Sequence, residues 1–174
     1  MSDTSRMPRR TLLPVVVLLT VAALGLASWG GWMWHDRRAR PGPGLKTDEI
    51  HAMDAARQFV VNVFSYRAGA NFDADFQRAL AGATGDLATQ VRATESPLRQ
   101  QLTASKLTAT TGNVKSAGVE GMQGAAIQVL VVVETAATDS TGKTINERQQ
   151  RMEVSMTAVK GTWLASGLTS VGLI

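Results

Sequence analysis

One apolar stretch near the start of the chain limits every other structural assignment. Residues 12–34 contain no charged side chain, and the stretch ends with Trp29, Trp32 and Trp34. As an α-helix it would be about 34 Å long, enough to cross a hydrocarbon core of roughly 30 Å with some tilt. Tryptophan is enriched at membrane interfaces, so the indoles indicate one boundary of the span. The sequence therefore predicts one transmembrane helix over residues 12–34.

A cleaved signal peptide is the main alternative to a permanent anchor. Its apolar region is normally about 7 to 15 residues long and ends in a small-residue cleavage site. Here the nearest small-residue stretch is Leu26-Ala27-Ser28, which has a bulky residue where the site needs a small one. The chain also has no cysteine, which excludes a lipoprotein anchor and disulfide bonds. We expect an uncleaved anchor.

The net charge of +4 comes from the flanks of the apolar stretch, because residues 45–174 carry as many acidic as basic side chains. Arginines beside a bilayer interact favourably with anionic headgroups. Nucleic-acid binding would instead need basic residues clustered on the soluble part. We therefore expect a membrane partner and no nucleic-acid partner. The residues assigned to the membrane interface are Trp29, Trp32, Trp34, Arg9, Arg10, Arg37, Arg38 and Arg40.

The chain divides into four predicted regions. Arginine counts on the two flanks are equal and leave the orientation open, whereas the short leading tail permits an amino terminus inside the cell and a domain outside the cytoplasmic membrane. The regions are a basic tail (1–11), a transmembrane helix (12–34), a proline- and glycine-bearing linker (35–46) and an extracytoplasmic α+β domain (47–174).

The first part of the domain has helical periodicity. Apolar residues repeat at helical spacing after Thr47, which we expect to cap the first helix. Acidic residues at the expected helix starts, Asp73, Asp75 and Asp86, are explained by capping and by the helix dipole. Pro97 either restarts the third helix or kinks it. The expected helices cover residues 48–66 and 73–81, with a third beginning near residue 86.

From about residue 107 the composition changes to threonine, valine and small residues, with recurring hairpin signals. Between residues 151 and 158 apolar and polar side chains alternate cleanly, which indicates a strand covered on one face only. The expected strands cover residues 108–119, 126–138 and 151–158, with a last strand from about 162 to 171.

Three helices followed by about four strands fit an α+β domain in which the helices pack on one face of a curved antiparallel sheet. This order resembles the cone-shaped domains of nuclear transport factor two and ketosteroid isomerase. Such folds host enzymes, ligand binders and scaffolds, so the fold alone leaves the function open.

Local motifs make the resemblance more specific. They are Phe64-Ser65-Tyr66, the run Asn-Phe-Asp-Ala-Asp-Phe at 71–76, and Ala83-Thr84-Gly85-Asp86. With the tail, span and linker, they make the whole chain similar to the Mce-associated membrane proteins of actinobacteria. That resemblance implies a domain in the cell envelope, protein subunits of an Mce-type lipid transport complex as partners, and a scaffolding role without catalysis or a cofactor.

An isomerase-like pocket is the sharpest enzymatic alternative. It would pair a carboxylate base with a hydrogen-bond donor in an apolar cavity. Tyr66 is the only tyrosine, and Glu134 could supply the base if it faced the interior beside it. His51 with Asp48 and Asp54 could be drawn as a metal site on one helix face, although a solvated first turn explains the same residues.

Several large apolar residues invite a second hypothesis, a lipid bound inside the cone. Core packing explains the same residues, because a domain of this size needs them to bury its helices against the sheet. The candidates for an apolar cavity or core are Phe59, Phe64, Tyr66, Phe76, Met152 and Met156.

Two functional classes stay open at this point. The leading class is a single-span, non-catalytic scaffold for a lipid transporter, and an alternative within it is an inner-membrane component of type IV secretion or conjugation machinery. The other class is a membrane-tethered ligand binder or isomerase-like cone. We expect no metal and no cofactor in the leading class.

Overall fold

The computed structural model describes residues 45–173 of the chain. The predicted anchor therefore lies outside the described residues, and so do all the residues assigned to the membrane interface, so these assignments stay predictions. Within the described part, no helix is long and apolar enough to cross a membrane.

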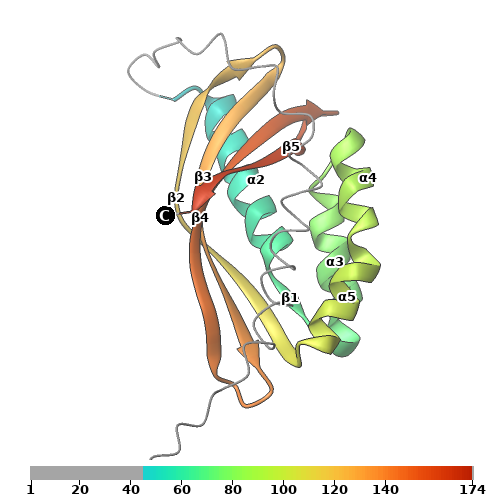
Figure 1. The fold of residues 1–174 in the computed structure, drawn as a ribbon. Coiled ribbons are helices and arrows are strands. Elements are labelled where there is room, and N and C mark those ends of the chain that lie inside the picture. Colours follow the sequence, from blue (N-terminus) through green and yellow to red (C-terminus); the bar gives the residue numbers. More distant parts are fainter. Residues whose placement is uncertain (1–44, 174) are drawn as a thin grey trace, which may run out of the picture.

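The described residues form an α+β domain in which helices precede a meander of strands, as expected from the sequence (Figure 1). The elements are α2 (Thr47–Phe64), β1 (Tyr66–Arg67), the 3-10 helix η2 (Gly69–Asn71), α3 (Phe72–Ala81), α4 (Gly85–Ala93), α5 (Glu95–Ala104), β2 (Leu107–Gln123), β3 (Ala126–Asp139), β4 (Thr144–Val159) and β5 (Thr162–Leu173).

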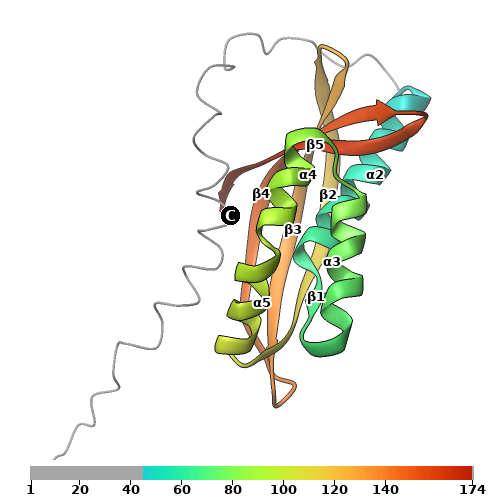
Figure 2. The same ribbon diagram turned by 90° about the vertical axis from the view of Figure 1, so that its right-hand side faces the viewer.

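The sheet has five antiparallel strands in the order β1-β2-β3-β4-β5, one more than predicted. Strand β1 was missed because two residues carry no alternation of polar and apolar side chains. Register shifts interrupt the pairing of β2 with β3 at three places, and such bulges increase the local twist. The sheet is thereby curled into a half-barrel, and the helices lie on its concave side (Figures 1 and 2).

Helix starts and ends differ in detail from the expectations. Thr47 is the first helical residue rather than the cap, because the cap position is held by Lys46, whose backbone N–H donates to Glu49 Oε2 at 2.8 Å. Helix α2 ends at Phe64, so Tyr66 lies in a strand and outside the helix. Asp73 is likewise inside the first turn of α3 and does not cap it.

The predicted third helix is two helices, α4 and α5, which meet at Thr94. Pro97 is the third residue of α5, where its missing N–H breaks no intrahelical bond because the first turn leaves these donors unpaired. The Thr94 carbonyl accepts the first α5 bond from Leu98 N–H at 2.9 Å. The proline therefore restarts the helix rather than kinking it.

The core lies between the concave face of the sheet and the helices. Strand β3 contributes Ile127, Val129, Val131 and Val133, all at most 2% exposed. At Gly112 in β2 an added Cβ would lie 2.7 Å from the Cβ of Phe64. Glycine at this position therefore allows the end of α2 to pack directly on the strand.

Candidate interaction surface

The apolar residues proposed for a cavity or core lie together in the packed interior. Phe59, Tyr66, Phe76, Met152 and Met156 are each at most 4% exposed. Phe64 is partly buried and packs against the same cluster. None of the six lines either of two shallow hollows on the surface of the described residues.

Three aromatic rings pack together at the β1 end of the sheet. The Tyr66 ring lies 5.8 Å from Phe72 and 6.4 Å from Phe76, and the two phenylalanine rings are 5.9 Å apart, measured between centroids. The guanidinium of Arg99 lies 4.4 Å above the Phe72 ring and covers the cluster from outside. Such spacings are typical of stabilising aromatic packing.

The base and donor of the isomerase hypothesis are not brought together. Glu134 alternates with the buried Val133 along β3 and therefore lies on the opposite, convex face of the sheet. There its Oε1 forms an ion pair with Lys115 Nζ at a distance of 2.8 Å. Burial, and to a smaller extent the Asp75 carboxylate, raise the pKa of the Tyr66 hydroxyl. This tyrosine stays neutral, and the condition for the pair, a Glu134 that faces the interior beside Tyr66, is not met.

The metal hypothesis has no geometric support in the described residues. His51 is exposed on α2, as are Asp48 and Asp54. Within residues 45–173 no group of three or more histidine and carboxylate side chains could hold a metal ion.

A buried carboxylate is the main feature that the sequence did not reveal. The side chain of Asp75 on α3 is 1% exposed, although a residue in the first turn would ordinarily be solvated. Its Oδ2 accepts from the backbone N–H and the Nε of Arg67, both at 2.9 Å. Its Oδ1 accepts from Nη2 of Arg67 and Nη2 of Arg78, both at 2.6 Å.

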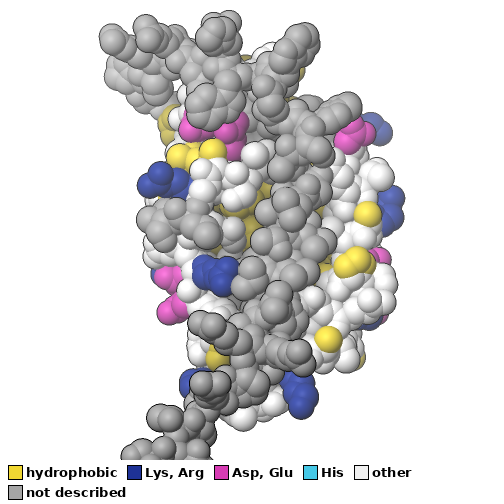
Figure 3. All heavy atoms as spheres, in the orientation of Figure 1, with side chains coloured by type: hydrophobic (Ala, Val, Ile, Leu, Met, Phe, Trp, Pro, Cys, Tyr) yellow, Lys and Arg dark blue, Asp and Glu magenta, His cyan; other side chains and the backbone are white. Residues whose placement is uncertain are grey.

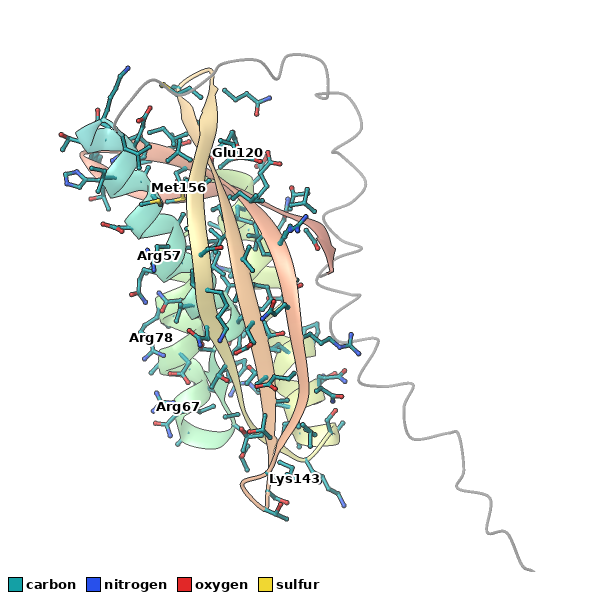
Figure 4. All side chains as sticks on the ribbon, turned by 90° about the vertical axis from the view of Figure 1, so that its left-hand side faces the viewer. Arg57, Arg67, Arg78, Glu120, Lys143 and Met156 are labelled. Carbon is teal, nitrogen blue, oxygen red and sulfur yellow. The ribbon has the colours of Figure 1, made fainter. Side chains whose placement is uncertain are left out.

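This network connects β1 to α3. The hydrogen bonds from the Arg67 side chain lower the pKa of Asp75 to about 2, against the opposing effect of burial. Both guanidinium groups are about half exposed at the surface, and Figure 4 labels Arg67 and Arg78 along the same side of the domain. With four donors on two oxygens the carboxylate is saturated, so we assign it a structural role.

The helices leave the convex face of the sheet uncovered (Figure 4). A shallow hollow lies there between β2 and β3. Gly118 forms part of its floor, and no heavy atom outside its chain neighbours lies within 4 Å of where its Cβ would be. Leu130, which pairs with Gly118, and Val132 supply partly exposed apolar side chains. The lining residues are Ser116, Ala117, Gly118, Val119, Glu120, Leu130 and Val132.

Charged groups border this hollow on both sides. The Lys115–Glu134 ion pair lies at one end, and the neighbouring strand β4 places Arg151 opposite Val132 and Glu153 opposite Leu130. An apolar centre with a charged border is the usual anatomy of a protein contact surface. In Figure 3, lysine and arginine side chains on the face in view are scattered, without the single basic patch typical of a nucleic-acid interface.

Solved structures share this fold at low sequence identity, and no curated protein matches the chain. An IcmL-like type IV secretion system protein from Legionella pneumophila is 9% identical, with 75% of this chain and 95% of that chain covered and a TM-score of 0.59. A periplasmic fragment of TraM is 12% identical, with 72% of this chain and 98% of that chain covered and a TM-score of 0.58. A TrwG component of the type IV secretion system from Bartonella birtlesii is 16% identical, with 76% of this chain and 95% of that chain covered and a TM-score of 0.58. At such identities the likeness shows the fold alone.

Family membership is established at the level of the whole chain. The description of the matching family names no Mce system, so the expected link to Mce transport receives no support from it. Because the family model described as "Uncharacterized protein Rv1363c/MT1408-like" matches residues 11–171, the chain belongs to the Rv1363c/MT1408-like family.

Proposed function

We propose that this protein is a non-catalytic assembly component of the cell envelope. A single span over residues 12–34 anchors it in the cytoplasmic membrane, and the described domain lies outside that membrane. The domain binds another envelope protein through the convex face of its sheet, and so assembles or stabilises a membrane complex.

The observation that carries the proposal is the uncovered convex face with its apolar hollow. The four α-helices of the described residues pack on the concave side, so none of them covers the partly exposed Leu130 and Val132. Exposed apolar side chains with a polar border mark protein contact sites more often than scattered single residues do.

The packed interior of the domain also agrees with a binding role. Phe59, Phe76 and Met156, which were candidates for the lining of a lipid cavity, are buried in one packed core cluster. The nearest approach to a catalytic pair, Tyr66 with Asp75, is closed, because Tyr66 is 4% and Asp75 1% exposed. Chemistry at these groups would require an opening of the core.

The fold likeness supports only the general kind of complex that we propose. Proteins described as type IV secretion components share the fold, which favours a multiprotein envelope machine of that general kind as the context. Subunits of an Mce-type lipid transporter are the other class of partner that we consider, on the sequence resemblance alone.

The hollow can be filled by one substitution. In the full chain, Gly118→Trp adds a large side chain over Leu130 and Val132, and its Cβ meets no neighbouring atom within 4 Å. We expect affinity purification from native membranes to recover at least about tenfold less partner, since the few hot-spot contacts at the centre of an interface each contribute about 2 kcal/mol or more, and about 1.4 kcal/mol is a factor of ten.

Gly118→Ala is the matched control, because it changes the backbone freedom equally without filling the hollow. Thermal unfolding of both variants is expected to stay within about 0.5 kcal/mol of the parent, as for ordinary surface changes. Undiminished partner recovery with Gly118→Trp would exclude this face as the docking site.

A further inference from the structure

One end of the domain carries most of its exposed large hydrophobic side chains. The start of α2, the turn between β2 and β3 and the turn between β4 and β5 all lie at this end, at the top in Figures 1 and 2. We call it the entry tip, defined by its exposed apolar residues Leu45, Ile50, Met122 and Val159. These four are 41%, 42%, 60% and 36% exposed, and among described residues only Val171 is comparable.

Three separate segments therefore place apolar side chains at the same end. Met122 is the next to last residue of β2, and Val159 is the last residue of β4. Figure 4 labels Glu120 near this end and Lys143 at the opposite end, in the turn between β3 and β4. Around that opposite turn the exposed side chains are polar, from Ser140 to Thr144.

From this arrangement we infer that the entry tip rests on the bilayer and inserts Met122, Ile50 and Val159 into its interfacial region. The inference rests on the proposed anchor, and it adds an orientation and a lipid contact that anchoring alone does not require. Interfacial amphipathic helices bind in a comparable way, with their apolar face roughly 5 to 10 Å into the headgroup and acyl boundary.

The length of the linker before the domain favours the bilayer as the surface that the entry tip contacts. Residues 35–44, between the predicted span and Leu45, can reach at most about 35 Å when fully extended. Strand β3 alone, Ala126–Asp139, runs about 45 Å from the entry tip to the opposite end. The domain therefore cannot stand upright on its opposite end, because Leu45 would then lie farther from the membrane than the linker reaches. The entry tip, in contrast, stays within about 35 Å of the end of the predicted span.

Charge complementarity contributes little to the expected contact. Asp48, Glu49 and Glu120 near the tip outnumber Lys46 and Lys160. An anionic surface would not attract this end, so the binding would depend on apolar insertion. Anionic lipid should therefore not strengthen the contact.

The absence of cysteine allows a direct test on the full chain. Single cysteines are introduced as Met122→Cys at the tip, Ser140→Cys at the opposite end and Val171→Cys as a matched exposed apolar site. Each is labelled with an NBD fluorophore, and the protein is reconstituted into phosphatidylcholine vesicles containing a lipid with a nitroxide high on its acyl chain. A parallel set contains phosphatidylglycerol.

We expect the label at 122 to be blue-shifted and quenched several-fold more than the labels at 140 and 171, and no more strongly with phosphatidylglycerol than without it. Quenching at 122 no stronger than at the two controls would overturn the inference. A blue shift without quenching would overturn it too, because it would show that protein and not lipid covers the tip.

Alkaline carbonate extraction of the same vesicles separates this inference from the proposed anchor. Retention of the chain with an unquenched label at 122 would remove the tip contact alone. Release of the chain would remove the anchor and, with it, the inference that depends on it.

Discussion

Replacing Phe76 with alanine is expected to lower the free energy of unfolding by about 3 to 5 kcal/mol, the range found for large-to-small changes at buried phenylalanines. Phe76 is fully buried, and its ring packs 5.9 Å from Phe72 and 6.4 Å from Tyr66. The substitution removes a buried ring and leaves a cavity between α3 and β1. Part of the loss is the pairwise aromatic term, about 0.5 to 1.5 kcal/mol per pair.

Guanidinium unfolding of the full chain in detergent, followed by circular dichroism, measures this loss. Ile50→Ala is the control, since Ile50 is 42% exposed and its truncation should change stability by no more than about 0.5 kcal/mol. A loss below about 1 kcal/mol at Phe76 would mean that the interior contains a space into which the chain can relax, as a ligand-binding cone would have.

Replacing Asp75 with asparagine should be the most destabilising polar substitution, at about 2 to 3 kcal/mol. The amide keeps the volume but removes the charge that holds Arg67 and Arg78, and its NH₂ group opposes one of their donors. The cost stays below that of a fully buried ion pair because both guanidinium groups are half exposed and regain water. Asp73→Asn is the matched control, since its exposed ion pair with Arg99 contributes at most about 1 kcal/mol.

The pH dependence of the stability loss in Asp75→Asn tests whether the lost charge causes it. The pKa of Asp75 is lowered to about 2 in the folded protein, so its charge stabilises the fold above the ordinary carboxyl pKa near 4 and loses that effect as the pH falls toward 2. The stability difference between the parent and Asp75→Asn should be full at pH 6, should shrink progressively below about pH 5 and should be mostly lost as the pH falls through about 2. A difference that stayed constant over this range would indicate a packing effect instead of a charge effect.

The buried face of the strands could be predicted from the sequence, although β4 begins at Thr144, seven residues before the predicted start at 151. Met152, Val154 and Met156 alternate with polar residues, and the structure buries all three on the side of the helices. Periodicity of this kind reports directly which face is covered. The α+β class followed because helical and strand patterns occupy separate halves of the domain.

Features that depend on contacts between distant residues could not be predicted. Helix α2 stops at Phe64 because the chain joins the sheet there, where Ser65 Oγ accepts from Gly112 N–H at 3.0 Å. The pattern before Tyr66 gives no sign of that contact. Tertiary pairing overrides local helical preference in such cases.

Asp75 illustrates the same limit at the level of chemistry. An acidic residue in a helical first turn is explained locally by the helix dipole. Its burial depends on Arg67, which reaches it only because β1 and η2 reverse the chain between them. Without that geometry, an arginine eight residues earlier in the sequence gives little indication that it pairs with Asp75. The convex hollow was missed for a similar reason, since Gly118 and Leu130 become neighbours only through strand pairing.

Site-specific photo-cross-linking in native membranes tests the central claim most directly. A benzophenone amino acid at Val132 of the full chain lies on the convex face, and the same group at the exposed Gln90 of α4 lies on the helical side. A docking function predicts a discrete adduct with another envelope protein from position 132 and none from position 90. Absence of any protein adduct from position 132, with the chain folded and retained in the membrane, would contradict the account.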